Sequence, residues 1–374
     1  MKIGILCHST YGGSGVVASE LGKLLARRGH QVHFITVGYP FRLADFEPNI
    51  FIHEVAAFQH PLFKAPPYFL TQVTKTVEVL QQHQLDLLHA HYAVPHSLGA
   101  HLARQIAGRQ VPVITTLHGT DTSLVGAHEE FYELTRYSLE VSDLVTVVSN
   151  FLAKQTRGTF EYQGELPVVY NFVDTEVFRP TDQSLRNQLT PQGEALIVHL
   201  SNFRPLKRVL DVLHVFHRVR QQQPARLVMI GDGPELPAAE KLAAELNLTG
   251  DILFLGQQDT VAPLLAAADV MLFPSCCESF GLAALEALSC GVPVIATTSG
   301  GIPEVILHGE VGFLTGVGQV EEMANYTLLL LKDDLLRQRM SRLAREHAST
   351  RFKADRWVER YEQIYQEVLQ QTGR

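Results

Sequence analysis

The sequence predicts an α/β protein of two domains that face each other across a cleft, each built on a mainly parallel sheet. Its 374 residues are too many for one ordinary core. Short apolar, β-branched segments recur along the chain with amphipathic segments between them. Such nearly continuous apolar strands are typical of parallel sheets that helices cover on both faces. A polar stretch that contains a proline interrupts this rhythm near the middle, which indicates a domain boundary.

Strand-like segments occur in both halves of the chain. Those of the first half are KIGILC, QVHFITV, LDLLHAHY, PVITTLHG, LVTVVSN and PVVYNFV, and those of the second half are ALIVHLSNF, RLVMIGDG, DILFLGQ, DVMLFPS, PVIATT and GFLT. We place the linker in residues 171–180, so that the domains span residues 1–170 and 171–354.

The last segment, residues 355–374, is predicted to be an amphipathic helix. It places Trp357, Tyr361, Ile364, Tyr365 and Val368 on one helical face. So much aromatic surface requires a partner, and we expect this helix to dock back on the first domain.

Bulk composition favours a protein that binds small ligands. The formal net charge is −8, so no general basic field exists to hold nucleic acid or an anionic membrane. No apolar stretch is long enough to span a bilayer, and the apolar run in MKIGILCHST is short for a secretory signal. We therefore expect a cytoplasmic protein without nucleic-acid or membrane partners. The oligomeric state cannot be read from the sequence, and a homodimer stays open.

The four cysteines do not form a disulfide framework in so long a chain. Cys276 and Cys277 are neighbours and lack the C-x-x-C spacing of zinc or redox sites. We therefore expect Cys7, Cys276, Cys277 and Cys290 to be free thiols that pack as small core residues.

A glycine-rich loop follows the first strand and opens a helix. Gly12, Gly13 and Gly15 would let backbone amides approach a ligand closely, and a helix N-terminus favours phosphate or carboxylate. GSGVVA also satisfies the G-x-G-x-x-A pattern of dinucleotide oxidoreductases. That class needs a carboxylate at the end of the second strand, where Val37 and Gly38 stand instead. A tight turn without a ligand is the plain alternative.

Histidines gather at the ends of two later strands, in HAHYAVPH and TLHGTD. His89 and His91 share a strand face, which allows a zinc site. However, Asp121 is the nearest carboxylate and no H-E-x-x-H or C-x-x-C element accompanies them. We expect His89 and His96 to be structural and bonded to backbone, and His118 to contact a ligand.

Two cations and two carboxylates mark the second half. Arg204 and Lys207 lie about one turn apart in a helix that Pro205 is expected to begin, a good site for a diphosphate. A solvated basic helix start that includes Arg208 is the alternative. Glu278 and Glu286 are separated by eight positions, about 12 Å of helix rise.

This separation exceeds what the paired carboxyl groups of glycosidases span, about 5 to 9.5 Å. The two glutamates instead suit an extended ligand with hydroxyl groups at both ends, such as a sugar joined to a ribose through a diphosphate. We expect Ser279 to cap a helix from Phe280 to about Ser289, with Gly291 as its left-handed end.

The segment ESFGLAALEALSCGVPVIATTSGGIPEVILHGEVGFL resembles the E-x7-E region of retaining glycosyltransferases of the GT-B fold, which have two Rossmann-like domains. GGSG, SNFRPLKR, GDGPE and the final helix follow in family order along nearly the whole chain. GGSGVVASELGKLLARRGHQVHFIT, PFRL, HAHYAVPH, TLHGTD and GGIPEVI more narrowly resemble the N-acetyl-α-D-glucosaminyl L-malate synthases. That family transfers GlcNAc from UDP-GlcNAc to the hydroxyl of L-malate, the first step of bacillithiol synthesis.

The resemblance implies roles for particular residues. The second domain would bind the donor and the first the acceptor. Donor binding would involve Gly13, Asn202, Arg204, Lys207, Glu278, Phe280, Gly281, Leu282 and Glu286. The acceptor would meet Ser14, Tyr92, Thr116 and Arg136. The catalytic residues would be Arg204, Lys207, His118 and Glu278.

The sequence has no D-x-D motif, so we expect no metal and no other cofactor. Arg204, Lys207 and helix amides would then neutralise the departing UDP. Three alternatives stay open: a related glycosyltransferase with another donor or acceptor, a UDP-sugar epimerase, and a nucleotide-binding oxidoreductase.

Overall fold

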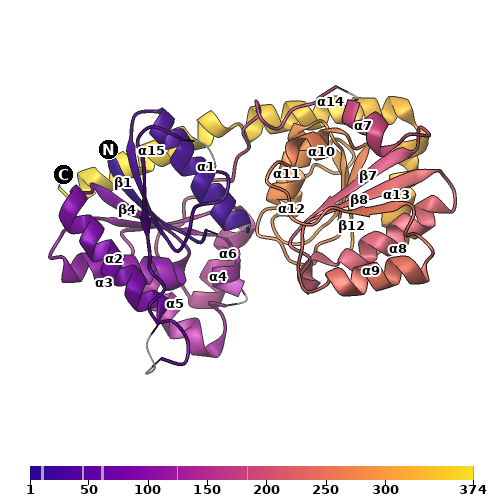
Figure 1. Cartoon of the computed structure of the whole chain (residues 1–374). Helices are drawn as coiled ribbons and strands as arrows, with labels where there is room; N and C mark the ends of the chain where they lie inside the picture. The colour runs from indigo at the N-terminus through magenta and orange to yellow at the C-terminus, as the bar shows by residue number, and fades with distance from the viewer. Residues whose placement is uncertain (10–11, 44–45, 60–62, 124, 183, 374) are drawn as a thin grey trace. The chain divides into compact units, whose positions relative to one another are not determined.

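The computed structural model describes residues 1–9, 12–43, 46–59, 63–123, 125–182 and 184–373. The chain divides into two compact units, one of residues 1–170 and 355–374, the other of residues 171–354 (Figure 1). Each unit contains a parallel six-stranded sheet, which confirms the predicted two-domain α/β fold. Among the described residues, no helix is both long and apolar enough to cross a bilayer.

The first unit has the strand order β3-β2-β1-β4-β5-β6. Its strands are β1 (Lys2–Leu6), β2 (Gln31–Thr36), β3 (Ile50–Glu54), β4 (Leu87–His91), β5 (Val113–Leu117) and β6 (Leu144–Val147). The direction of strand progression reverses between β1 and β4, which pair with Ile5 beside His89. In open parallel sheets such a reversal creates a crevice at the carboxyl ends of the strands, where ligands bind.

The helices of the first unit connect these strands. They are α1 (Gly13–Arg27), α2 (Tyr68–His83), the π-helical turn η1 (Ala93–Ser97), α3 (Leu98–Ile106), α4 (Thr120–Ser123), α5 (Glu129–Val141), α6 (Asn150–Phe160) and α15 (Ala354–Gln371). The yellow helix α15 runs beside the indigo elements of the N-terminus in Figure 1. Tyr361 and Tyr365 of α15 are fully buried, and Glu362 forms an ion pair with Arg28.

The second unit has the strand order β12-β11-β10-β7-β8-β9. Its strands are β7 (Ala195–Leu200), β8 (Ala225–Ile230), β9 (Ile252–Phe254), β10 (Val270–Phe273), β11 (Val294–Thr297) and β12 (Gly312–Thr315). Its helices are α7 (Ser184–Leu189), the 3-10 turn η2 (Pro205–Lys207), α8 (Val209–Arg220), α9 (Leu236–Glu245), α10 (Ala262–Ala266), α11 (Leu282–Ser289), α12 (Ile302–Val305), α13 (Val320–Lys332) and α14 (Asp334–Arg351). All six strand segments predicted for this half are confirmed.

The first half differs from the prediction at two places. The strand β3 was not expected, because it is an edge strand whose residues are half-buried or exposed rather than uniformly apolar. Conversely, PVVYNFV is not a strand. Val168 forms an isolated bridge with Val147, and Val173 forms one with Lys353, so the segment divides its pairing between the two units.

Candidate functional site

In the first unit, the end of β1 leads to the start of α1. Gly12 is the N-cap of this helix in an extended conformation, and no acidic residue occupies the first turn. Ser14 is buried in that turn. The first turn therefore combines backbone amides that have no acceptor within the helix with a hydroxyl and no acidic side chain, as an anionic ligand requires. Part of the glycine-rich loop, residues 10 and 11, lies outside the described residues.

Tyr92, directly after β4, has an unusual backbone. Its φ is +100°, a conformation that non-glycine residues rarely adopt and that often marks functional positions. Its N–H donates to the carbonyl of Thr116 (3.1 Å). The tyrosine ring centroid lies 5.3 Å from that of His8 and 5.8 Å from that of His118. Tyr92 and His118 are therefore brought together at the carboxyl edge of the sheet.

His118 follows β5 and is held from two sides. Its Nε2 lies 2.9 Å from Nδ1 of His91, so one of these neutral rings donates to the other. Asp121 accepts hydrogen bonds from the backbone N–H groups of His118 (3.1 Å) and Gly119 (2.8 Å). Burial lowers the pKa of His118 to about 3 and raises that of Asp121 to about 6. His118 is therefore a neutral hydrogen-bonding group at pH 7.

His89 and His96 are structural, as predicted, but their partners are side chains rather than backbone. His89 contacts Tyr365 Oη at 2.8 Å and Thr116 Oγ1 at 2.7 Å. His96 contacts Gln72 at 2.7 Å. The hydroxyl of Thr116 also meets Thr146 at 2.7 Å, which places it in the interior of the unit. These contacts hold α15 against the middle of the sheet.

Arg136 stands apart from the other predicted acceptor residues. Its guanidinium forms ion pairs with Glu133 (3.0 Å) and Glu140 (2.6 Å) on the solvent side of α5. The same two carboxylates raise the pKa of Arg136. None of the interactions found among the described residues joins it to Ser14, Tyr92 or Thr116.

In the second unit, the segment after β7 differs from the predicted continuous helix. Pro205 opens the 3-10 turn η2 rather than an α-helix, and Arg208 follows in the left-handed conformation (φ +51°) before α8 starts at Val209. The Lys207 N–H donates to the carbonyl of Arg204 at 2.8 Å, which closes the turn. Arg204 is exposed and Lys207 is half-buried.

Lys207 and Glu278 form an ion pair, so two residues predicted from separate motifs meet in space. Their side chains are only 17% and 12% exposed. The backbone supports the pair, because the N–H of Cys276 donates to the carbonyl of Leu206 at 2.9 Å. Lys207 Nζ also lies 5.9 Å from the ring centroid of Phe273. A cation and a carboxylate are thus held together beside the end of β10.

Two glycines hold the backbone of Glu278. Gly300 has φ +63°, and a Cβ at that position would lie 1.9 Å from the carbonyl oxygen of Glu278. The N–H of Gly301 donates to the same oxygen at 2.8 Å. Any side chain at position 300 would therefore displace Glu278, which explains why this loop requires glycine.

Helix α11 begins later than predicted. Gly281, with φ +96°, is its N-cap, and the first helical residue is Leu282, so Ser279 is not the cap. Phe280 is buried and packs edge-on against Phe352, with ring centroids 5.7 Å apart. The left-handed Gly281 therefore forms the turn from Phe280 into the helix. The predicted left-handed end at Gly291 is confirmed by its φ of +77°.

Glu286 lies on α11 and is buried, with 3% of its surface exposed. A buried carboxylate must be hydrogen-bonded or paired to remain charged. Glu286 is the fifth residue of α11, whereas Glu278 precedes the helix.

The cysteines near these glutamates are not all core residues. Cys276 and Cys277 are exposed, whereas Cys7 and Cys290 are buried. The prediction of core packing was therefore wrong for the adjacent pair, because β10 ends at Phe273 and the chain emerges before Glu278. All four thiols are free. Burial raises the pKa of the Cys277 thiol, so it is not an activated thiolate.

Family models match both halves of the chain. The model described as glycosyl transferases group 1 matches residues 181–347, and that described as glycosyltransferase family 4 matches residues 11–177. N-acetyl-alpha-D-glucosaminyl L-malate synthase from Bacillus anthracis is 45% identical over 99% of this chain and 97% of its own. The chain belongs to the GT-B glycosyltransferase family that includes this synthase.

Solved structures agree with this fold. Sucrose-phosphate synthase from Thermosynechococcus elongatus superposes with a TM-score of 0.82 at 23% identity, covering 98% of this glycosyltransferase and 99% of that chain. Anabaena HepE in complex with UDP and glucose gives a TM-score of 0.81 at 22% identity, covering 97% and 99% of the two chains. The family membership favours glycosyl transfer over the oxidoreductase alternative.

One feature of this glycosyltransferase was not evident from sequence motifs. The GDG turn after β8 packs tightly on the loop after β7, because a Cβ on Gly233 would lie 2.5 Å from the carbonyl oxygen of Asn202. The side-chain Oδ1 of Asn202 is buried and has no hydrogen-bond partner among the described residues. A buried acceptor without a donor is costly, so this atom is well suited to receive a hydrogen bond from a ligand.

Proposed function

We propose that this glycosyltransferase moves GlcNAc from UDP-GlcNAc to the hydroxyl of L-malate, giving GlcNAc-α-malate and UDP, the first step of bacillithiol synthesis. The observation that carries the proposal is the 45% identity, over 99% of the chain, to a relative named for this product. The proposed partners are these two small molecules, and the proposed location is the cytoplasm.

The second unit is the proposed donor site. Arg204 and Lys207 would neutralise the diphosphate, and Glu286 would accept hydrogen bonds from the ribose hydroxyls. Glu278 and the backbone of residues 280–282 would hold the sugar hydroxyls. The ion pair between Lys207 and Glu278 supports this arrangement, since it already holds a phosphate-binding cation next to a hydroxyl-binding carboxylate.

The remaining donor contacts are proposed for Gly13 and Asn202. Gly13 is the first residue of α1, where backbone amides point to the carboxyl edge of the sheet. Asn202 would contribute its buried Oδ1, for which the described part of the chain offers no hydrogen-bond partner.

The first unit is the proposed acceptor site. A dicarboxylate such as malate requires hydroxyl groups, free amides and a guanidinium. Ser14 and Tyr92 supply hydroxyl groups, Thr116 forms the strand end behind them, and Arg136 would have to exchange its glutamate partners for the acceptor. His118 would contact the sugar near its 6-position as a neutral donor or acceptor.

We propose front-face attack with retention of the α configuration. The malate hydroxyl oxygen forms a bond to C1 of GlcNAc while the bond from C1 to the diphosphate oxygen breaks, and the hydroxyl proton passes to the departing phosphate. The cations stabilise the charge that develops on UDP, so no metal is required. Interactions that strengthen only as this charge develops raise the turnover number.

A product assay tests the proposal. UDP-GlcNAc is incubated with L-malate, D-malate, glycolate or succinate, with and without EDTA, and UDP and glycoside are measured. We expect GlcNAc-α-malate only with L-malate, at a rate that EDTA leaves unchanged. Turnover with another hydroxy acid alone would reassign the acceptor, and an epimerised UDP-sugar formed without acceptor would replace the transferase. Loss of turnover in EDTA with recovery in Mg²⁺ or Mn²⁺ would refute metal independence.

A further inference from the structure

Three histidines from separate elements meet in the first unit. They are His33 in the middle of β2, His53 on β3 and His83, the last residue of α2. Each offers one ring nitrogen that lies within 4.8 Å of the other two. Nδ1 of His33 and Nε2 of His53 are 2.9 Å apart, and the ring centroid of His83 lies 4.7 Å and 4.9 Å from those of His33 and His53.

The cluster is separate from the proposed acceptor site. His83 ends α2 just before the start of β4, and its carbonyl accepts from Nζ of Lys2 at the start of β1 (3.4 Å). The histidines come from β2, β3 and the end of α2, on one side of β1 in the strand order, whereas Tyr92 and His118 follow β4 and β5 on its other side. Glycosyl transfer as proposed above uses none of the three.

One ring nitrogen of the cluster lacks a partner in the described part of the chain. Nε2 of His33 is buried without a hydrogen-bond partner among the described residues, although its Nδ1 lies 2.9 Å from Nε2 of His53. A buried polar atom without a partner is unfavourable and calls for an explanation.

Packing alone does not account for this arrangement. Phe51 stacks on His33 with centroids 4.7 Å apart, so an apolar ring already covers one side of the cluster. Three imidazoles with nitrogens facing one another can share few hydrogen bonds, because each neutral ring has one donor and one acceptor. Two lysines lie near the cluster: Lys75 is paired with Glu78 at 2.7 Å, whereas Lys2 donates to the carbonyl of His83 at 3.4 Å.

We propose that His33, His53 and His83 bind one divalent transition-metal ion of the zinc class, with water completing the coordination. Imidazole nitrogen is a preferred ligand of Zn²⁺, Ni²⁺ and Cu²⁺. Zn–N bonds of about 2.0 to 2.1 Å imply nitrogens about 3.4 Å apart in a tetrahedron, so the nitrogens of His33 and His53, now 2.9 Å apart, must separate slightly, within a cluster whose nitrogens all lie within 4.8 Å of one another. His53 and His83 are half-buried and have room to do so.

The ion would have a structural role. β3 is the edge strand of the sheet, and β2 is its neighbour. A metal held by β2, β3 and the end of α2 ties the edge strand to the helix that packs beside it. Because the ligands come together only in the folded unit, binding stabilises that unit in proportion to the logarithm of the metal concentration above Kd.

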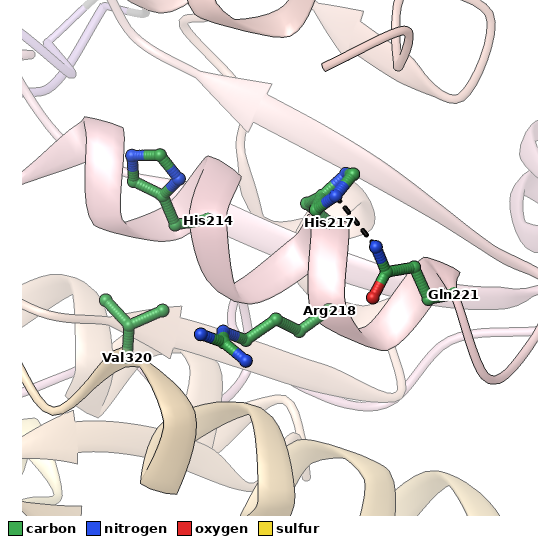
Figure 2. Close-up of a pocket in the computed structure, with 5 residues that line it drawn as sticks. All are labelled: His214, His217, Arg218, Gln221 and Val320. Atoms are coloured by element: carbon green, nitrogen blue, oxygen red, sulfur yellow. Dashed lines mark hydrogen bonds between the residues drawn. The ribbon is translucent and has the colours of Figure 1, made fainter.

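A second histidine pair could bind metal adventitiously and provides the matched control. His214 and His217 are three positions apart on α8 in the other unit, in the pocket that Figure 2 shows. There His217 is hydrogen-bonded to Gln221 at 2.9 Å, and the guanidinium of Arg218 lines the same pocket. A fixed cation disfavours a second one, so this pair is the weaker candidate.

The test uses the full-length chain, freed of metal by chelator dialysis and titrated with Zn²⁺ in a calorimeter. We expect one ion per chain. His53→Gln and His83→Gln should each weaken binding at least about tenfold, because loss of a group that only supports a metal ligand already costs about 10- to 100-fold. His214→Gln should bind as the parent does. Co²⁺ should give the visible bands of a four- or five-coordinate ion in the parent but not in H53Q.

Thermal unfolding keeps the test independent of folding defects and of glycosyl transfer. Zn²⁺ should raise Tm of the parent and of H214Q but leave the Tm of H53Q and H83Q unchanged, each variant being folded by circular dichroism. The proposal is overturned if the parent binds no stoichiometric Zn²⁺, if H53Q and H83Q bind as the parent does, or if H214Q abolishes binding.

Discussion

The contact between Gly300 and Glu278 predicts that a single methyl group will impair donor use. Replacing Gly300 with alanine puts a Cβ 1.9 Å from the carbonyl oxygen of Glu278 and 2.9 Å from its carbonyl carbon. Both neighbours are backbone atoms, so no flexible side chain can give way. The loop or the Glu278 segment must therefore move.

The size of the movement follows from the contact. Real Cβ atoms do not approach closer than 3.0 Å, so the two atoms must separate by at least 1.1 Å. A misplacement of about 1 Å in a binding group costs about 100-fold in catalysis, which equals about 2.7 kcal/mol. Alanine at φ +63° adds backbone strain of about 1 to 2 kcal/mol to folding.

Gly309→Ala separates these two effects. Gly309 lies in the same unit with φ +80°, and a Cβ there meets nothing within 4 Å. Both variants therefore place an alanine in the strained left-handed backbone conformation, and only G300A also displaces Glu278. Urea unfolding should show a stability loss in both, the larger in G300A.

The decisive measurement is kcat/KM for UDP-GlcNAc at saturating L-malate. We expect about a 100-fold loss in G300A and little change in G309A. Equal kcat/KM for the two variants would refute the reasoning, because the position of the Glu278 carbonyl would then not matter for the donor.

Two further predictions concern charge. Lys207→Ala should lower kcat by about 100- to 1,000-fold in a single-turnover assay, as loss of a group that stabilises developing charge does. Arg208→Gln is the control and should leave kcat unchanged, since Arg208 pairs with Asp211. An unchanged kcat in K207A would exclude the proposed role of Lys207. Burial lowers the pKa of His199 from 6.5 to about 4, so the stability that its neutral form provides is complete above pH 6.5 and is lost as pH falls toward 4. The free energy of unfolding of His199→Gln, measured with denaturant, should therefore fall less steeply between pH 6.5 and 4 than that of the parent, by about one proton or about 1.4 kcal/mol per pH unit. An identical pH dependence in the variant and the parent would contradict a neutral buried imidazole at His199.

The fold was largely predictable because buried parallel strands are continuous apolar runs. That signal identified every strand of the second unit and failed for β3. Phe51 of β3 is 42% exposed, and the strand is bordered on one side only. An edge strand of this kind lacks the apolar run that the prediction depends on. PVVYNFV was predicted to be a strand because it is apolar, but its residues form only isolated bridges, one in each unit, and no continuous ladder.

The candidate site was predictable where residue type and spacing restrict the chemistry. The eight-position spacing of Glu278 and Glu286 predicted about 12 Å of helix rise, but the segment is helical only from Leu282. The pairing of Lys207 with Glu278 was not predictable, because it joins loops that are 71 positions apart. The same applies to the burial of Asn202 Oδ1, which depends on how closely Gly233 lets the next loop approach.

The histidines show most clearly why spacing alone is insufficient for metal sites. His89 and His91 have the alternation of two ligands on one strand, yet His89 is saturated by the hydroxyls of Tyr365 and Thr116. Both partners provide oxygen atoms that are already hydrogen-bonded, so a metal there would have to break two short contacts. His33 and His53 are 20 positions apart and have no motif, but adjacent strands put their nitrogens at 2.9 Å. Whether a pair of histidines can bind a metal therefore depends on the hydrogen bonds that each imidazole already makes. Those hydrogen bonds are set by the folded sheet and cannot be read from the spacing.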